Sequence, residues 1–249
     1  MEKQNFIDVK NITVRYGDTT ILEDVSCEIK KGEIFVIVGG SGCGKSTLLR
    51  QIIGLEKPAD GSVIIDGIDF VNAQGTDRQK TLRKFGVLFQ SGGLFASMTI
   101  AENIALSLNA YTSLSADEIE DVIEIKLRSV GLSGYQNYLP SEISGGMRKR
   151  AALARAMVLD PDILCFDEPS SGLDPVTSAS LDELITELNE MLGTTMVVVT
   201  HDLSSIFSIS QRLIMLDKEA KGIIASGTPQ ELKKFDSDKR VFNFFNRIA

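Results

Sequence analysis

Short runs of β-prone residues dominate the first ninety positions of the chain. Gly17 and Asp18 form a turn between the first two runs, and residues 34–38 are the longest uninterrupted apolar run in the chain. A continuous apolar run of this kind is typical of a strand that is buried on both faces. The pattern therefore predicts strands at residues 6–16, 21–30, 34–38, 63–65 and 86–89.

From residue 100 onward, the apolar residues recur at the spacing of an α-helix. Ser115 and Glu118 form a capping box, and the apolar residues after them keep helical spacing until Gly131. Beyond residue 160, strand-like and helix-like patterns alternate. They predict strands at residues 163–166, 196–199 and 212–216, and helices that begin after Asp174, Asp202 and Thr228.

Alternating strands and helices imply a mostly parallel sheet that is covered by helices. The chain has no internal repeat, low-complexity tract or linker-like stretch. We therefore expect an α/β fold in a single domain over residues 1–249, with a helical insertion.

Composition and charge narrow the class of protein. Of the 249 residues, 43% are apolar and 24% are charged, as in ordinary folded proteins. The apolar runs are far shorter than the roughly 20 residues needed to span a bilayer. Three scattered cysteines suggest neither a disulfide scaffold nor a thiolate zinc site, and they fit a reducing cytosol. The net charge of −8 argues against general polyanion binding, so any phosphate ligand must be held by a local site.

Residues 39–47 match the phosphate-loop pattern G-x-x-x-x-G-K-[S/T] between a predicted strand and an apolar helix. Glycines let the backbone curl so that its N–H groups point inward, and the helix N-terminus adds partial positive charge. Lys45 would reach the β- and γ-phosphates, and the Ser46 hydroxyl would bind Mg²⁺. A flexible glycine-rich turn is the alternative. The predicted nucleotide-binding residues here are Gly39, Gly40, Ser41, Gly42, Cys43, Gly44, Lys45, Ser46 and Thr47.

Two acidic residues, Asp167 and Glu168, follow directly after the strand at 163–166. Because open parallel sheets bind ligands at the carboxyl ends of their strands, Asp167 would hold Mg²⁺ and Glu168 would orient the water that attacks the γ-phosphate. The only histidine, His201, follows the strand at 196–199 and would reach the γ-phosphate from the same edge. The alternatives are two solvated acids at a helix start and a structural histidine.

Ser144, Gly145 and Gly146 precede a predicted helix that carries several cations. Glycines at a helix start again present backbone N–H groups and the positive end of the helix dipole to an anion. A chain that holds its nucleotide at residues 39–47 needs no second cradle, unless the second one serves a nucleotide bound by another copy. Dimerisation would explain it. The alternative is a plain N-terminal cap with a solvated basic face formed by Arg148, Lys149, Arg150 and Arg155.

Taken with Gln90 and the segment 171–174, these motifs resemble the full motif set of the ABC ATPases over nearly the whole chain. The resemblance implies a P-loop NTPase with a RecA-like core, an N-terminal antiparallel β-subdomain and a helical subdomain at about 91–157. It implies ATP and Mg²⁺ as cofactors and a homodimer that sandwiches two ATP molecules.

The same resemblance implies roles for individual residues. Tyr16 corresponds to the aromatic residue that stacks on adenine, Gln90 to the glutamine that contacts Mg²⁺ and the attacking water, and Asp174 to the residue that links the two sites across the dimer. The implied catalytic residues are Glu168, His201, Gln90 and Lys45. Met147 stands where the family has glutamine, which removes any polar contact of that side chain, and Gly40 replaces a frequent proline.

Residues 89–95 and 144–150 are similar to the Mla-type lipid-transport ATPases that serve Mce-protein systems. This narrower resemblance implies a bacterial subunit at the cytoplasmic face of the inner membrane. It would work beneath an integral membrane permease that moves phospholipid between the inner and outer membranes. The resemblance also implies two further partners, a small regulatory subunit and a periplasmic Mce-type lipid-binding protein. It implies no nucleic-acid partner.

Three other functions share part of the motif set. An ABC import ATPase for another small-molecule cargo differs only in the segment 91–103 and near Met147. A non-transport ABC protein that acts on DNA or ribosomes usually has a long coiled-coil insertion or two tandem ATPase domains. Neither feature fits in 249 residues. A P-loop kinase leaves Ser144, Gly145 and Gly146 unexplained.

The C-terminal tail, residues 235–249, carries an apolar stripe. Val241, Phe244, Phe245 and Ile248 follow helical spacing. The simplest expectation is a terminal helix that docks on its own domain. The resemblance to Mla-type C-terminal extensions implies instead a contact with the other ATPase copy or with a regulatory subunit.

Overall fold

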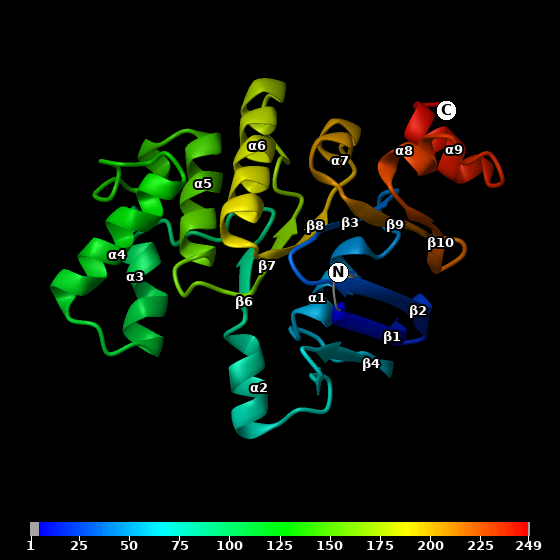
Figure 1. Cartoon of the computed structure of the whole chain (residues 1–249), viewed down its shortest axis with the longest axis horizontal. Helices are drawn as coiled ribbons and strands as arrows, with labels where there is room; N and C mark the ends of the chain where they lie inside the picture. Colours follow the sequence, from blue (N-terminus) through cyan, green and yellow to red (C-terminus); the bar gives the residue numbers. More distant parts are fainter. Residues whose placement is uncertain (1–4, 249) are drawn as a thin grey trace.

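Two β-sheets organise residues 5–248, the part of the chain that the computed structural model describes (Figure 1). The smaller sheet is antiparallel and has the strand order β2-β1-β4-β5. The larger sheet has the order β10-β9-β3-β8-β7-β6, and its neighbouring strands are parallel except for β10 and β9. The strands are β1 (Asn5–Tyr16), β2 (Thr19–Lys30), β3 (Ile34–Gly39), β4 (Asp60–Ile65), β5 (Ile68–Asp69), β6 (Phe85–Leu88), β7 (Ile163–Asp167), β8 (Thr195–Val199), β9 (Arg212–Asp217) and β10 (Gly222–Gly227).

The central strands of the larger sheet are apolar because both of their faces are covered. Every residue of β3 and β8 is buried, as expected in a covered parallel sheet. Side chains along β3 alternate between two hydrophobic cores. Val36 and Val38 belong to the core that contains the helices α3 to α7, whereas Phe35 and Ile37 belong to the core shared with α1 and the smaller sheet. The strand predicted at 34–38 is confirmed.

Helices cover the larger sheet and also form a group beside its β6 edge, where α3, α4 and α5 lie together (Figure 1). The predicted capping box of Ser115 and Glu118 starts α4. None of the helices in residues 5–248 has the length and apolar character needed to cross a membrane. The helices are α1 (Lys45–Ile52), α2 (Gly75–Leu82), α3 (Ile100–Tyr111), α4 (Ala116–Ser129), α5 (Gly145–Ala156), α6 (Pro175–Leu192), α7 (Leu203–Ile209), α8 (Pro229–Lys233) and α9 (Lys239–Asn246), with a 3₁₀ turn at Pro140–Glu142.

Three short elements escape the sequence pattern. Helix α2 buries only Thr81, so it has no apolar stripe to reveal it. Strand β5 is two residues long. Strand β10 forms an antiparallel hairpin with β9 at the edge of the larger sheet, where partial exposure weakens the apolar pattern. The structure of these three elements depends on contacts with adjacent segments and is not marked by a periodic pattern of apolar residues.

The C-terminal helix packs on its own chain. Val241 and Phe245 of α9 are buried, and the Phe245 ring meets the Phe207 ring of α7 edge-on, with 6.2 Å between their centroids. The predicted stripe is wrong at its last member, because Ile248 is 50% exposed. Arg247 adopts the left-handed conformation and caps α9, so the helix ends before Ile248.

Candidate functional site

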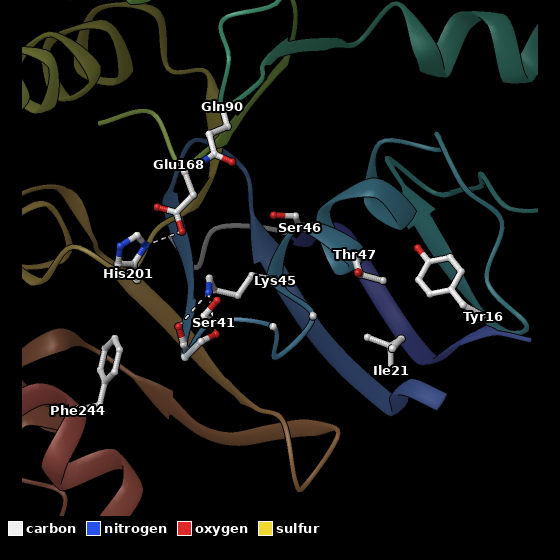
Figure 2. Close-up of a pocket in the computed structure, with 14 residues that line it drawn as sticks. Tyr16, Ile21, Ser41, Lys45, Ser46, Thr47, Gln90, Glu168, His201 and Phe244 are labelled. Carbon is white, nitrogen blue, oxygen red and sulfur yellow. Dashed lines mark hydrogen bonds and ion pairs between the residues drawn. The ribbon is translucent and has the colours of Figure 1, made fainter. Parts of the chain in front are cut away.

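A cleft opens at the edge of the larger sheet where its parallel strands end. Asp167 of β7 and Ile37 of β3 both pair with Val199 of β8, so the three strands finish side by side. The loops that follow them bring most of the predicted site residues together (Figure 2). The cleft has a volume of about 650 Å³ and is lined by Tyr16, Ile21, Gly39, Gly40, Ser41, Gly42, Gly44, Lys45, Ser46, Thr47, Gln90, Glu168, His201 and Phe244.

The loop between β3 and α1 curls through glycines with positive φ. Gly44, the N-cap of α1, has a φ of 100°, and no side chain caps the helix. Gly39 has a φ of 145°, and a Cβ atom there would lie 2.3 Å from the carbonyl oxygen of Leu216. An uncapped helix start leaves backbone N–H groups for an anion. The loop therefore has the geometry that a phosphate cradle requires.

Lys45 is held inside this loop. The residue is 8% exposed, and its Nζ donates hydrogen bonds to the carbonyl oxygens of Gly39 at 2.9 Å and Gly40 at 3.0 Å. The ammonium group and the start of α1 thus place positive charge in the middle of the cleft. Cys43 is buried below the loop, where burial raises the pKa of its thiol, and it does not line the cleft.

Ser46, Gln90 and Asp167 bring side-chain oxygens to the cleft or its border. The Ser46 hydroxyl donates to Oδ1 of Asp167 at 2.7 Å, although Asp167 itself does not line the cleft. Gln90 enters the cleft after β6, and its Nε2 donates to the Ser171 hydroxyl at 3.1 Å, which leaves the amide oxygen for another partner. Hydroxyl, carboxylate and amide oxygens are the ligands that suit Mg²⁺. This donor set fits the predicted metal.

Glu168 and His201 meet at one end of the cleft (Figure 2). The Nδ1 atom of His201 lies 2.8 Å from Oε1 of Glu168. Glu168 has a positive φ of 49°, which is uncommon for a residue with a side chain, and its backbone N–H donates to the carbonyl of Val199. The side chain of Glu168 is 12% exposed and that of His201 is 66% exposed. A buried carboxylate with an exposed imidazole beside it suits proton transfer at the cleft wall.

Tyr16 lies at the opposite end of the cleft from Glu168 and His201 (Figure 2). Its hydroxyl donates a hydrogen bond to Glu56. The bond to Glu56 is the main reason that the pKa of Tyr16 is raised. The ring is 47% exposed, so a flat apolar surface is available at this end.

Ser144, Gly145, Gly146 and Asp174 do not line the cleft of their own chain. Ser144 caps α5 by accepting a hydrogen bond from the Met147 N–H at 3.2 Å. Asp174 caps α6 by accepting from the N–H groups of Val176 and Thr177, both at 3.1 Å, and its hydrogen bonds to Thr177 lower its pKa. The two helix starts touch, because a Cβ atom on Gly146 would lie 2.4 Å from a methyl carbon of Thr177.

Comparisons with known proteins identify the family. A family model described as ABC transporter matches residues 22–171. The intermembrane phospholipid transport system ATP-binding protein MlaF of Haemophilus influenzae is 40% identical over 97% of this chain and 90% of its own length. This chain belongs to the ABC transporter family. MlaF of Escherichia coli K12 is 42% identical over 98% of the chain and 90% of its own length. The probable ribonucleotide transport ATP-binding protein mkl of Mycobacterium leprae is 42% identical over 96% of the chain and 68% of its own length.

Solved structures of ABC proteins share the fold. The dimeric structure of MJ0796, a bacterial ABC transporter cassette, matches with a TM-score of 0.80 and 34% identity over 89% of this chain and 98% of that one. CbiO1 of Clostridium perfringens, part of the transporter complex CbiONQ, matches with a TM-score of 0.83 and 28% identity over 98% of this chain and 96% of that one. The expected α/β ABC ATPase fold and the ATP-binding ATPase class are confirmed.

The alternative of a plain N-terminal cap with a solvated basic face is only partly wrong: Ser144 does cap α5 and Arg148 is exposed, but the other three cations of this ABC ATPase donate to the backbone of neighbouring segments. Lys149 donates to the carbonyl oxygen of Gln90, and Arg155 donates to the carbonyls of Gly93 at 2.6 Å and Gly92 at 3.1 Å. Arg150 donates to the carbonyl of Val130 at 2.9 Å. Side chains of α5 therefore hold the backbone of several neighbouring segments.

Two residues that line the cleft were not predicted from the sequence of this ABC ATPase. Ile21 lies on β2, and Phe244 reaches the cleft from α9 at the far end of the chain. Phe244 belongs to the apolar stripe at residues 241–248, but the spacing of apolar residues does not indicate which of them lies against a ligand cleft. Only the packing of α9 on α7 and α8 places it there.

Proposed function

We propose that this chain is the ATP-hydrolysing subunit of an ABC transporter that drives phospholipid movement between bacterial membranes through a separate permease. The observation that carries the proposal is the near full-length similarity to two MlaF proteins, which extends over 90% of their lengths. The cleft supplies the groups that ATP hydrolysis needs: the loop with Lys45, the oxygen ligands near Ser46, and the Glu168–His201 pair.

In the proposed site, the backbone N–H groups before α1 and the Lys45 ammonium bind the β- and γ-phosphates. Ser46, Gln90 and Asp167 hold Mg²⁺. When bound, Mg²⁺ supplies positive charge that offsets the charge developing on the phosphate oxygens. Tyr16 stacks on the adenine ring, with Glu56 keeping its hydroxyl in place.

Glu168 orients the attacking water and accepts its proton at a carboxylate oxygen. His201 contacts the γ-phosphate, and its hydrogen bond to Glu168 fixes the orientation of the imidazole ring. The positive φ of Glu168 supports this role, because strained backbone is retained where a side chain must be aimed precisely at a site.

The proposed active unit is a homodimer. Ser144, Gly145 and Gly146 of one copy bind the γ-phosphate of an ATP held in the cleft of the other, and Asp174 links the two sites. Two observations support this arrangement: none of these residues lines the cleft of its own chain, and the α5 and α6 starts lie in contact. Residues 1–249 then act as one nucleotide-binding domain, with the helical subdomain at about 91–157.

The proposed place of work is the cytoplasmic face of the bacterial inner membrane, against the permease. Phe89, just before Gln90, and Phe95, later in the same segment, are 37% and 56% exposed and offer an apolar contact for the permease. The proposed partners also include a small regulatory subunit and a periplasmic Mce-type lipid-binding protein, as the resemblance implies.

The variant Glu168→Gln tests the ATPase mechanism. It keeps the shape of the side chain and removes the base, so turnover should fall by roughly 10²–10³-fold while ATP binding is retained. Steady-state phosphate release and nucleotide binding measure the two quantities. Glu183→Gln, an exposed change on α6, is the control and should leave both unchanged.

The same Glu168→Gln protein tests the dimer. With ATP and Mg²⁺, size-exclusion chromatography coupled to light scattering should give twice the monomer mass. A protein that stays monomeric with bound ATP, or one that hydrolyses ATP normally, would contradict the proposed site.

The cargo needs a separate experiment, because one relative is named for ribonucleotide transport. The co-purified permease complex should be reconstituted into vesicles. We expect ATP-dependent movement of a fluorescent phospholipid and bound phospholipid in the purified complex. Movement of labelled ribonucleotides without phospholipid movement would favour the alternative of another small-molecule cargo.

A further inference from the structure

Lys149 is a buried cation next to the proposed catalytic groups. It lies in the second turn of α5 and is 7% exposed. Its Nζ donates a hydrogen bond to the backbone carbonyl oxygen of Gln90. Burial lowers the pKa of the ammonium. The negative charges of Asp167 and Glu168 act in the opposite direction, so both carboxylates interact electrostatically with Lys149.

A buried ammonium needs compensation, because removing a charge from water is costly. Here the compensation comes from the Gln90 carbonyl and from the negative charges of Asp167 and Glu168. Replacing Lys149 by an apolar side chain would leave the Gln90 carbonyl without this donor. It would also remove a positive charge near Asp167 and Glu168.

A second cation of α5 holds the same segment. Arg155 donates to the carbonyl oxygens of Gly92 and Gly93, so residues 90–93 are fastened to α5 at two points. The same helix begins at Ser144, where we place the contact with the other copy's ATP. A shift of α5 would therefore move the backbone of Gln90 with it.

We propose that Lys149 is a positioning residue for ATP hydrolysis, which holds the Gln90 backbone against α5 beside Asp167 and Glu168. Through this contact, the placement of Gln90 follows the placement of the Ser144 end of α5. The inference rests on the proposed function, since it concerns the same site.

The test compares Lys149→Met with Arg150→Met. Arg150 lies on the same helix and also donates to backbone, but its hydrogen bonds go to Val130 and Ser180 rather than to Gln90. We expect Lys149→Met to lower kcat about tenfold, which corresponds to about 1.4 kcal/mol, with less than a twofold change in KM for ATP. Lys149→Arg keeps a charged donor and should retain most of the activity. Arg150→Met should keep kcat near that of the natural chain, even if its thermal stability falls.

Hydrogen exchange gives a readout that does not depend on activity. Amides of residues 90–93 should exchange faster in Lys149→Met than in the natural chain, and Arg150→Met should not show this change. An equal loss of kcat in both variants would mean that α5 is merely destabilised and would overturn the proposal. Unchanged kcat in Lys149→Met would overturn it as well.

The outcomes also separate this inference from the proposed function. If the natural chain hydrolyses ATP and Glu168→Gln does not, the proposed function stands whatever Lys149→Met does. If the natural chain with its permease lacks ATPase activity, the proposed function fails, and the exchange of residues 90–93 still decides whether Lys149 holds the segment.

Discussion

Helices α1 and α5 both begin at a glycine-rich segment, but the two helix starts differ. The N-cap of α1 is Gly44, which has no side chain to satisfy the first N–H groups. The N-cap of α5 is Ser144, and its hydroxyl accepts from the Met147 N–H. The first start opens into the cleft of its own chain, whereas the second does not line that cleft.

The glycines serve different purposes at the two sites. Near α1, Gly39 and Gly44 have positive φ and shape the curl of the loop. At α5, neither Gly145 nor Gly146 has positive φ, and Gly146 is small because Thr177 of α6 lies against it. The α1 loop thus has, within one chain, the backbone geometry that a phosphate cradle requires. The α5 start is a capped helix end that we propose to complete a site only in a second copy.

The largest effect is expected from Gly39→Ala, which attacks the complete cradle. The new Cβ atom would lie 2.3 Å from the Leu216 carbonyl oxygen and 2.6 Å from the Cys43 sulfur, and the positive φ alone costs about 1–3 kcal/mol. ATP affinity of the isolated chain should fall at least about tenfold, since 1.4 kcal/mol is tenfold in binding. Titration with a fluorescent ATP analogue measures it.

Gly40→Ala is the matched control for this prediction. Gly40 is the next residue in the loop, its φ is not positive, and a Cβ atom there would meet nothing within 4 Å. The loss of affinity should therefore be much smaller than for Gly39→Ala. Equal losses in the two variants would mean that backbone geometry at Gly39 is not what makes the cradle.

This contrast also shows how far the sequence can predict the site. The phosphate loop is local: one strand, one glycine-rich turn and one helix specify it, and all three can be recognised in residues 34–54. The same is true of Asp167, Glu168 and His201, because the order of parallel strands brings strand ends together. Motifs at strand ends were therefore predictable.

Contacts between distant segments were not predictable in this way. Phe244 enters the cleft only because α9 folds back onto α7 and α8. The charge pattern of α5 is compatible with a solvated face, because it does not reveal that Lys149, Arg150 and Arg155 donate to backbone carbonyls of other segments. Both features depend on tertiary packing, which a periodic pattern in one segment does not encode.

An intermediate effect is expected from Ser144→Ala, which attacks the second helix start. Loss of the capping bond costs about 1 kcal/mol, and the hydroxyl would no longer be available to a phosphate. ATP binding by the isolated chain should be unchanged, because Ser144 does not line its cleft. Turnover at saturating ATP should fall about tenfold, as expected for roughly 1.4 kcal/mol.

Ser115→Ala provides the control for the second start. Ser115 caps α4 with the same hydroxyl chemistry, accepting from the Glu118 N–H at 3.4 Å, and it is remote from the predicted site residues in sequence. Its replacement should reduce thermal stability without reducing turnover. If Ser144→Ala weakened ATP binding in the monomer, the division between a complete and an incomplete cradle would be wrong.

The smallest effect is expected from Glu56→Ala, because Glu56 lies beyond the C-terminal end of α1, away from the phosphate loop. Glu56 accepts hydrogen bonds from the Tyr16 hydroxyl and from Nε2 of Gln51 at 3.3 Å, and it pairs with Arg50 at 3.5 Å. It thus links the aromatic ring to α1, the helix whose start we propose to bind phosphate. Removing the hydrogen bond between Glu56 and Tyr16, worth about 1 kcal/mol, should raise KM for ATP about fivefold and leave kcat unchanged.

Two further variants serve as controls. Glu56→Gln keeps an acceptor and should restore most of the affinity. In a Tyr16→Phe chain, where the hydroxyl is already absent, Glu56→Ala should have no further effect. If kcat fell instead, the loss of Glu56 would also disturb the groups at the phosphate end of the cleft. The adenine end and the phosphate end of the cleft would then not act independently.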